Sequence, residues 1–288
     1  MTNYTVIDSD NYAASGIETI FFPGGEPHAK LPQFEGRVLF CGKLRNWSDV
    51  GFAAVVIDAL RHQKIDRLDA FIPYFPAARQ DRSDGAAAFT LKLVARLLCN
   101  RMSDDMHYDN GVDHWTHVFD AHSDVTIENT LATNWNWENL DQPVVREVVA
   151  VIAPDAGAVK RASDYRDTFH EYSGLLEATK RRNPQTGALG GYKMPKLPAI
   201  GHYVIVDDIC DGGGTFNLLM EAALADPFGA ESTFELVVSH GIFSRGLSAI
   251  HPRIEHITTT DSWCRLPSDN RLTVVKLDQL FNRIMEGI

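Results

Sequence analysis

The chain has 288 residues, of which 44% are hydrophobic and 23% charged, an ordinary globular composition with length enough for two modest domains. Its net charge is −11, so binding to nucleic acid or to an anionic membrane is not expected as its main role. The four cysteines form no CxxC pair, the N-terminus is polar and long apolar runs are absent, which together predict a cytoplasmic protein with free thiols and no membrane segment.

Short apolar runs alternate with helical patterns along the whole chain. Strands are expected at Thr19–Phe22, Arg37–Cys41, Leu68–Tyr74, Thr116–Asp120, Val148–Ala153, Tyr203–Val206, Glu235–Ser239, His256–Thr259 and Leu272–Leu277. Apolar spacings of three and four predict helices at Asp49–Arg61, Thr90–Cys99 and Asn217–Ala225. This alternation predicts an α/β protein with two mainly parallel sheets flanked by helices. The polar segment Asn134–Gln142 suggests domains at 1–143 and 144–288, and Asn100–Asp113 is expected to be a surface loop.

Residues 73–84, PYFPAARQDRSD, place a dense polar cluster directly after an apolar strand. The planar guanidinium of Arg79 can stack on a base or pair with a phosphate, and Gln80 can both donate and accept hydrogen bonds. The segment therefore favours a nucleotide-binding edge over an ordinary solvated turn.

Two further strand ends carry residues that could bind metal. In VFDAHSD, residues 118–124, Asp120 and His122 are expected on the same side of a strand end, with His122 either a hydrogen-bonded partner or a ligand. In IAPDAGAVKR, residues 152–161, Asp155 stands at the carboxyl end of a strand, where α/β sheets bind ligands. A helix N-cap is the equally good alternative for Asp155.

Three consecutive cations begin at Lys180 in the segment EATKRRNPQTGALGGYK, residues 177–193. Such a run is typical of a solvated loop. The alternative is a mobile flap that carries cations over a charged reaction centre.

Residues 203–216, YVIVDDICDGGGTF, are the most informative stretch. An apolar strand ends in Asp207 and Asp208, and a glycine loop then opens a helix. Backbone N–H groups at such a helix end bind phosphate, and the acidic pair suits sugar hydroxyls or a hydrated metal ion. The pattern indicates a ribose 5-phosphate site rather than a plain turn. Its phosphate loop consists of Asp211, Gly212, Gly213, Gly214 and Thr215.

These motifs carry a resemblance to a known family. VIVDDICDGGGT resembles the PRPP-binding motif shared by phosphoribosyltransferases and PRPP synthetases (ribose-phosphate diphosphokinases). PYFPAARQDR resembles the ATP-binding segment of PRPP synthetases, which phosphoribosyltransferases lack. The motifs occur in the family's order from Phe22 to about Thr260. The resemblance implies two phosphoribosyltransferase-like, Rossmann-like domains.

The resemblance also implies roles for single residues. It assigns ATP contacts to Phe22, Glu26, Arg79, Gln80 and Asp84, with Phe22 stacking on adenine bound to a neighbouring subunit. In FFPGGE, residues 21–26, Gly24 replaces the residue that reads the base.

The resemblance also implies that His122 and Asp155 are ligands of Mg²⁺. Lys180 and Arg182 match the cation pair that contacts the transferring diphosphate.

The function implied is Mg²⁺-dependent transfer of the diphosphoryl group of ATP to the 1-hydroxyl of ribose 5-phosphate, giving PRPP and AMP, in a homo-oligomer. One alternative keeps the chemistry with a larger acceptor such as ADP-ribose, suggested by the extra glycines and the altered Phe22–Glu26 segment. Another is a phosphoribosyltransferase, against which the ARQDR and KRR segments argue. A third is a catalytically silent regulatory subunit, against which the retained His122, Asp155, Lys180 and Arg182 argue.

Overall fold

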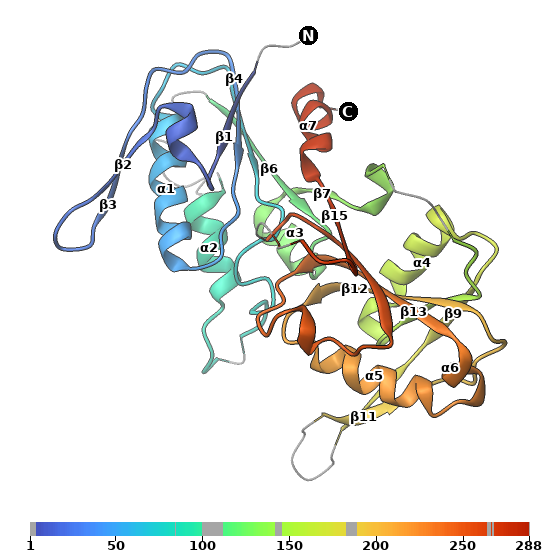
Figure 1. The fold of residues 1–288 in the computed structure, drawn as a ribbon. Helices are drawn as coiled ribbons and strands as arrows, with labels where there is room; N and C mark the ends of the chain where they lie inside the picture. Colours follow the sequence, from blue (N-terminus) through green and yellow to red (C-terminus); the bar gives the residue numbers. More distant parts are fainter. Residues whose placement is uncertain are drawn as a thin grey trace. The chain divides into compact units, whose positions relative to one another are not determined.

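A computed structural model describes residues 4–83, 85–99, 112–141, 146–182, 189–263, 266 and 268–287, with the backbone only at 181, 182, 189 and 190. The chain divides into two compact units. The first comprises Met1–Asn136 and Asp278–Ile288, and the second comprises Trp137–Leu277. Each unit has its own parallel sheet (Figure 1).

The first unit is built on a five-stranded sheet in the order β1-β4-β5-β6-β7, in which every pair is parallel. Its strands are β1 (Tyr4–Asp8), β4 (Arg37–Cys41), β5 (Arg67–Phe71), β6 (Asp113–Phe119) and β7 (Thr133–Trp135). A short antiparallel hairpin, β2 (Glu18–Phe21) and β3 (Pro27–Lys30), precedes β4. Nearly continuous apolar strands such as RVLFC are buried on both faces, as parallel sheets require.

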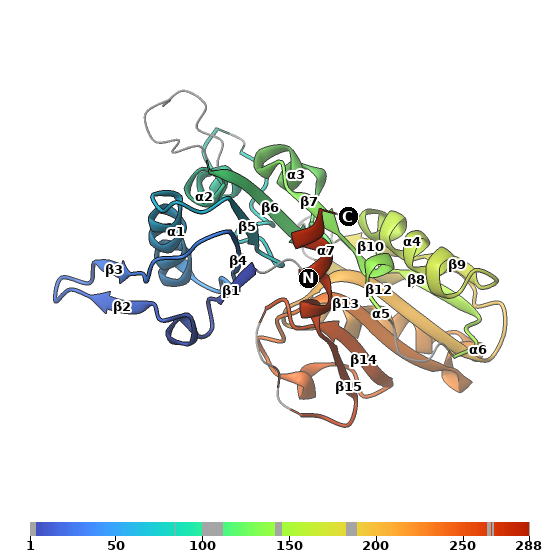
Figure 2. The same ribbon diagram turned by 90° about the horizontal axis from the view of Figure 1, so that it is seen from above.

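Because the strand order follows the chain order, right-handed crossovers place the connecting helices on one face of this sheet. These helices are α1 (Trp47–Arg61), α2 (Thr90–Leu98) and α3 (Asp124–Thr130). Asn46 caps α1 by accepting a hydrogen bond from the Asp49 N–H. The C-terminal helix α7 (Phe281–Glu286) lies against the opposite face (Figure 2).

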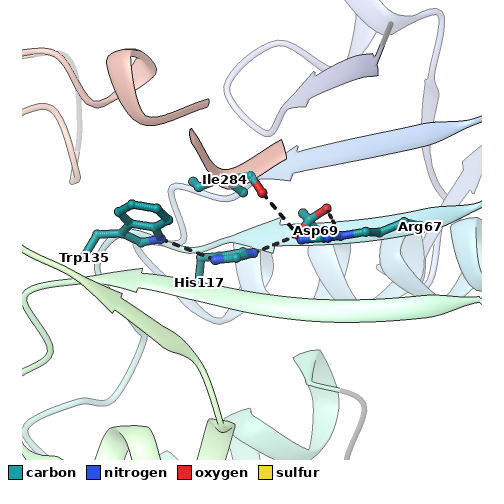
Figure 3. Close-up of polar contacts among 5 residues, drawn as sticks. All are labelled: Arg67, Asp69, His117, Trp135 and Ile284. Carbon is teal, nitrogen blue, oxygen red and sulfur yellow. Dashed lines mark hydrogen bonds and ion pairs between the residues drawn. The ribbon is translucent and has the colours of Figure 1, made fainter. Parts of the chain in front are cut away.

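A closed polar network lies under α7, on the face of the sheet that this helix covers (Figure 3). Asp69, which is fully buried, accepts hydrogen bonds from Arg67 at 2.7 and 2.5 Å and from His117 Nε2 at 2.8 Å. The Trp135 indole N–H donates to His117 Nδ1 at 3.3 Å, so its partners assign His117 the neutral tautomer with the proton on Nε2. Arg67 also donates to the Ile284 carbonyl of α7 at 3.5 Å, which ties the end of the chain to this unit.

The second unit contains a six-stranded, fully parallel sheet in the order β15-β14-β13-β12-β8-β9. Its strands are β8 (Ala150–Ala153), β9 (Gly174–Glu177), β12 (His202–Cys210), β13 (Thr233–Gly241), β14 (Ile254–Thr260) and β15 (Leu272–Val275). Helix α4 (Val159–Phe169) lies on one face, and α5 (Gly214–Leu224) and α6 (Pro227–Glu231) lie on the other (Figure 1). Chain order reverses between β8 and β12, and this is the position where open α/β sheets bind ligands.

An antiparallel two-stranded ribbon, β10 (Thr179–Arg182) and β11 (Leu189–Lys193), extends from this unit. The segment expected as a loop or flap at 177–193 is therefore a ribbon at both of its ends. The sequence does not predict this ribbon, because glycines and consecutive cations lack the apolar alternation by which strands are predicted.

The expected fold class is confirmed by the two parallel sheets and their flanking helices. Five 3₁₀ turns, Tyr12–Ser15, Trp137–Asn139, Ala156–Ala158, Leu247–Ala249 and Leu277–Leu280, complete the described elements. Cys41, Cys99 and Cys210 are buried and form no disulfide. Among the described helices, none combines the length and apolar character needed to cross a membrane. The segment expected at Asn100–Asp113 lies almost wholly outside the described residues, with Asp113 already in β6.

Candidate active site

The acidic pair lies within the last four residues of β12, and the glycine loop follows the carboxyl end of this strand, next to the reversal of chain order. Strand β12 pairs with β13 on one side and with β8 on the other, so its end lies inside the sheet. The loop then leads directly into the first turn of α5 at Gly214. The predicted strand, loop and helix are all present, so the loop lies at a helix N-terminus, where the first N–H groups have no partner within the helix.

Gly213 is required by the shape of this loop. Its φ is 76°, in the left-handed region that side chains disfavour. A Cβ atom there would also lie 2.5 Å from Ile250 Cδ1. Gly214, by contrast, has open space around its Cβ position. The two glycines therefore have different roles. Gly213 shapes the turn, and Gly214 leaves space at the helix N-terminus.

The two carboxylates of the pair destabilise each other. Asp208 is buried, and its backbone N–H donates to Asp207 Oδ1 at 2.9 Å. Burial first, and then the Asp208 carboxylate, raise the pKa of Asp207 well above its usual range, which the Arg161 charge partly offsets. Adjacent like charges at a strand end are costly unless a hydroxyl-bearing ligand or a cation satisfies them.

Asp155 caps a helix and pairs with a cation at the end of the neighbouring strand β8. Its Oδ1 accepts from the N–H groups of Gly157 and Ala158 at 2.9 and 3.2 Å, so the N-cap role is confirmed. Its Oδ2 forms an ion pair with Lys180 Nζ on β10. Partial burial disfavours the Lys180 charge, but the hydrogen bond and charge of Asp155, with Tyr192 and Asp207, raise the pKa of Lys180 overall. The structure thus brings together residues of three predicted motifs, because Asp155 and Asp207 both lie near the charged Lys180. The Arg182 side chain lies outside the described part.

Two residues that sequence reasoning missed also border this group. Tyr192 on β11 is the direct cross-strand partner of Lys180 and faces Thr215. A Cβ atom at Gly212 would lie 3.4 Å from Arg245 Nε, which places an exposed cation beside the phosphate loop. Arg245 follows β13, the strand paired with β12, so sheet topology could have indicated it. Tyr192 lies in a glycine-rich stretch that gave no such signal.

In the first unit, the ARQDR segment and the VFDAHSD segment follow β5 and β6, which are paired neighbours. Ser123 Oγ donates to Asp81 Oδ2 at 2.7 Å and joins the two segments. Arg79, Gln80 and His122 are exposed. Asp84 lies outside the described residues.

The expected placement of Asp120 and His122 on one side of a strand is wrong. Strand β6 ends at Phe119, and Asp120 has a φ of 44°, so alternation stops before these residues. Asp120 is buried and His122 is exposed. Only His122 is therefore presented to a ligand.

The β2–β3 hairpin carries Phe22 and Glu26 at its turn. The Phe22 N–H donates to the Glu26 carbonyl at 3.0 Å, and the Phe22 ring is 48% exposed. An aromatic side chain this exposed is compatible with stacking on a ligand, and that role stays a prediction.

Magnesium fits these residues only as an ion that arrives with a ligand. Among the described residues, no three His, Cys, Asp or Glu side chains group as a metal cage. Mg²⁺ commonly uses one or two carboxylates together with substrate phosphates, and Asp155, Asp207 and Asp208 supply carboxylates of that kind. The residues present therefore agree with a metal bound jointly with a nucleotide.

Comparison with known families agrees with this geometry. Residues 126–262 match the phosphoribosyl transferase domain, which includes β8, β12 and the phosphate loop. Residues 52–101 match the N-terminal domain of ribose phosphate pyrophosphokinase.

Several proteins with sequences similar to this chain are named ribose-phosphate pyrophosphokinase. A ribose-phosphate pyrophosphokinase of Hyphomonas neptunium is 30% identical over 196 residues, covering 66% of this chain and 59% of the relative. One of Bradyrhizobium diazoefficiens is 27% identical, covering 75% of this chain and 65% of the relative. One of Corynebacterium glutamicum is 26% identical, covering 81% and 71%. The matched part thus spans about three fifths to two thirds of the first two relatives.

A solved structure shows the same fold over the whole chain. Phosphoribosylpyrophosphate synthetase from Mycobacterium smegmatis superposes with a TM-score of 0.75 at 19% identity, covering 99% of this chain and 98% of that one. At this identity the likeness supports the fold alone. Together with the two family matches and the named relatives, it leads to one conclusion: the chain belongs to the PRPP synthetase (ribose-phosphate pyrophosphokinase) family.

Proposed function

We propose that this protein is a ribose-phosphate diphosphokinase, which transfers the diphosphoryl group of ATP to the 1-hydroxyl of ribose 5-phosphate and releases PRPP and AMP. The observation that carries the proposal is the end of β12, where an acidic pair, a glycine loop and a helix N-terminus adjoin Lys180. The glycine loop would bind the phosphate at one end of ribose 5-phosphate. The neighbouring acidic pair would orient the hydroxyls in the middle of the same molecule. The match to the N-terminal domain of ribose phosphate pyrophosphokinase favours this function over a simple phosphoribosyltransferase.

The acceptor would bind through the loop from Asp211 to Thr215. Backbone N–H groups at the start of α5 would hold the 5-phosphate with the Thr215 hydroxyl. Asp207 and Asp208 would accept hydrogen bonds from the ribose hydroxyls, which relieves the unfavourable carboxylate pair and fixes the sugar ring.

In the reaction, the anomeric oxygen attacks the β-phosphorus of ATP and loses its proton. The bond between the β-phosphorus and the oxygen that bridges to the α-phosphorus breaks, and AMP leaves with the electron pair. Lys180, released from Asp155, would stabilise the charge that spreads over the transferring group, and Arg182 would assist. Because this charge is greatest in the transition state, Lys180 contributes mainly to turnover.

Asp155 and His122 would hold magnesium together with the phosphates of ATP. When bound, the ion would offset phosphate charge and polarise the β-phosphorus. Asp155 would thus serve as a carboxylate that holds the metal, and Lys180 would serve as the cation that acts on the diphosphate.

The nucleotide would contact Arg79, Gln80 and Asp84, and a second copy of the chain would contribute Phe22 and Glu26. This arrangement requires a homo-oligomer. Sedimentation of the protein should therefore give a mass of at least two chains, and Phe22→Ala should raise the KM for ATP without changing that for ribose 5-phosphate.

Formation of AMP from ATP and magnesium, measured in parallel with ribose 5-phosphate and with ADP-ribose, tests the proposal. We expect turnover with ribose 5-phosphate and little with ADP-ribose. AMP formation that needs ADP-ribose would assign a different acceptor, and no AMP formation with either would contradict the proposed activity.

A further inference from the structure

The Tyr192 hydroxyl is a buried polar group that has no well-formed hydrogen bond within the described part of the chain. Tyr192 is 6% exposed, and its Oη has no hydrogen bond of ordinary geometry to any residue that the structure describes. Burying an unpaired hydroxyl costs free energy, so proteins rarely keep one without a use. Its surroundings indicate what that use is.

Tyr192 lies among residues of the candidate active site. Lys180 stands opposite it in the β10–β11 ribbon, and the charges of Asp155 and Asp207 reach its phenol. The Thr215 hydroxyl of the phosphate loop lies within hydrogen-bonding reach of it and lowers its pKa, although the two do not form a hydrogen bond of ordinary geometry. The phenol therefore lies between the loop that would hold the 5-phosphate and the cation that would act on the diphosphate.

The phenol is suited to donate a hydrogen bond to an anion. Burial raises the pKa of Tyr192 above its usual value, although Lys180 and Thr215 lower it in part. The group keeps its proton at neutral pH and offers an O–H donor. A donor is more useful than a further acceptor here, because Asp155 and Asp207 already supply acceptor oxygens next to it.

We infer that Tyr192 is an additional phosphate-binding residue, whose hydroxyl donates a hydrogen bond to an oxygen of the phosphate held by the Asp211–Thr215 loop. The identity of that phosphate as the 5-phosphate of ribose 5-phosphate rests on the proposed function. The contact would connect the phosphate loop to the β10–β11 ribbon, so that binding of the acceptor positions Lys180.

The substitution Tyr192→Phe removes only the hydroxyl. A hydrogen bond to a charged phosphate corresponds to a loss of about tenfold in affinity. We expect the KM for ribose 5-phosphate to rise about tenfold, with the KM for ATP unchanged. Since the hydroxyl has no hydrogen bond of ordinary geometry to the residues that the structure describes, the unliganded variant should melt at the same temperature as the wild type or slightly above it.

Tyr203→Phe is the matched control in the same unit, because its hydroxyl already donates to the Ala199 carbonyl at 2.5 Å. That variant should lose stability and keep both KM values. An unchanged KM for ribose 5-phosphate in Tyr192→Phe would overturn the inference, and so would a lower melting temperature without ligand, which would reveal a protein partner for the hydroxyl.

Calorimetric titration with ribose 5-phosphate and with inorganic phosphate separates this inference from the proposed function. Weaker binding of both by Tyr192→Phe supports the inference even if the wild type forms no AMP. Normal AMP formation with equal binding by both proteins refutes the role of Tyr192 and leaves the activity intact. If neither compound binds the wild type, both proposals fail.

Discussion

The two units each gather charged side chains at their sheets, but the clusters differ in how completely they are paired. Around Asp69 the buried carboxylate is fully enclosed by hydrogen bonds from Arg67 and His117. Around Asp207 two carboxylates adjoin each other, and the Tyr192 hydroxyl has no hydrogen bond of ordinary geometry in the described part of the chain. The first arrangement satisfies a buried carboxylate within the protein and so stabilises the folded state.

The second arrangement gains further stabilisation when a ligand binds. Like charges at the end of β12 and an open helix N-terminus gain partners from a sugar phosphate, which carries hydroxyls and an anionic oxygen. This difference indicates that a binding site is distinguished from a structural network by polar side chains with incomplete sets of partners, rather than by the number of its charges. Substitutions in the two clusters should therefore have opposite effects on stability and activity.

Removing the reaction-centre cation should have the largest effect. Lys180→Ala should lower kcat by about 10³-fold, since one positioned charge contributes about that much to a transition state. The KM for ribose 5-phosphate should change less than threefold, by rough expectation for a group that acts in the transition state. Lys193→Ala, an exposed lysine on the same ribbon, is the control and should retain activity. Equal losses in kcat and substrate affinity would assign Lys180 to binding instead.

Breaking the closed network should destabilise the protein without altering the chemistry. Asp69→Asn leaves Arg67 and His117 without their carboxylate and should lower the free energy of unfolding by about 3 kcal/mol. Urea unfolding measures this loss, and exposed Asp66→Asn serves as the control. A change below about 1 kcal/mol would show that the network contributes little to stability.

The same substitution should change the response to acid. The hydrogen bonds of His117 and Arg67 outweigh burial and lower the pKa of Asp69 below 3.8. Its stabilisation is therefore present above 3.8 and is lost as the pH falls below that value towards the lowered folded pKa. Unfolding curves of wild type and Asp69→Asn should converge in that acidic range.

Neutralising the open cluster should have the smallest effect on stability, and one of opposite sign. Asp207→Asn removes a repulsion and should raise the free energy of unfolding by about 1 kcal/mol at neutral pH. Because the folded-state pKa of Asp207 is raised, the wild type should gain relative stability as the pH falls towards that pKa, and the variant should lack this gain. Activity should decrease at least about tenfold, because an amide orients ribose hydroxyls less well. A less stable variant would contradict the unfavourable pairing inferred for Asp207 and Asp208.

The sequence predicts the β12 region well because local chemistry determines it. An apolar run must become a buried strand, and a loop with the φ of Gly213 demands glycine. Asp155 as a helix N-cap predicts that a helix begins here, but the extent of α4 is not predicted, because only Ala162 and Tyr165 of its residues are buried and its apolar pattern is weak. The positive φ of Asp120 likewise leaves no signature in VFDAHSD.

Long-range contacts are what the sequence could not show. The pairing of Lys180 with Tyr192 depends on a ribbon whose strands lack apolar alternation. The return of α7 to the first unit depends on contacts such as that of Arg67 with Ile284, which are 217 positions apart. No local pattern encodes either partner, although each determines which groups surround a site.

The transfer of labelled phosphate from ATP tests the central claim most directly. With magnesium and ribose 5-phosphate, label at the γ-position should appear in the sugar product, and label at the α-position should appear in AMP. This result requires transfer of an intact diphosphoryl group by the site at the end of β12. Label from the γ-position in inorganic phosphate, or formation of ADP with a singly phosphorylated sugar product, would contradict the account.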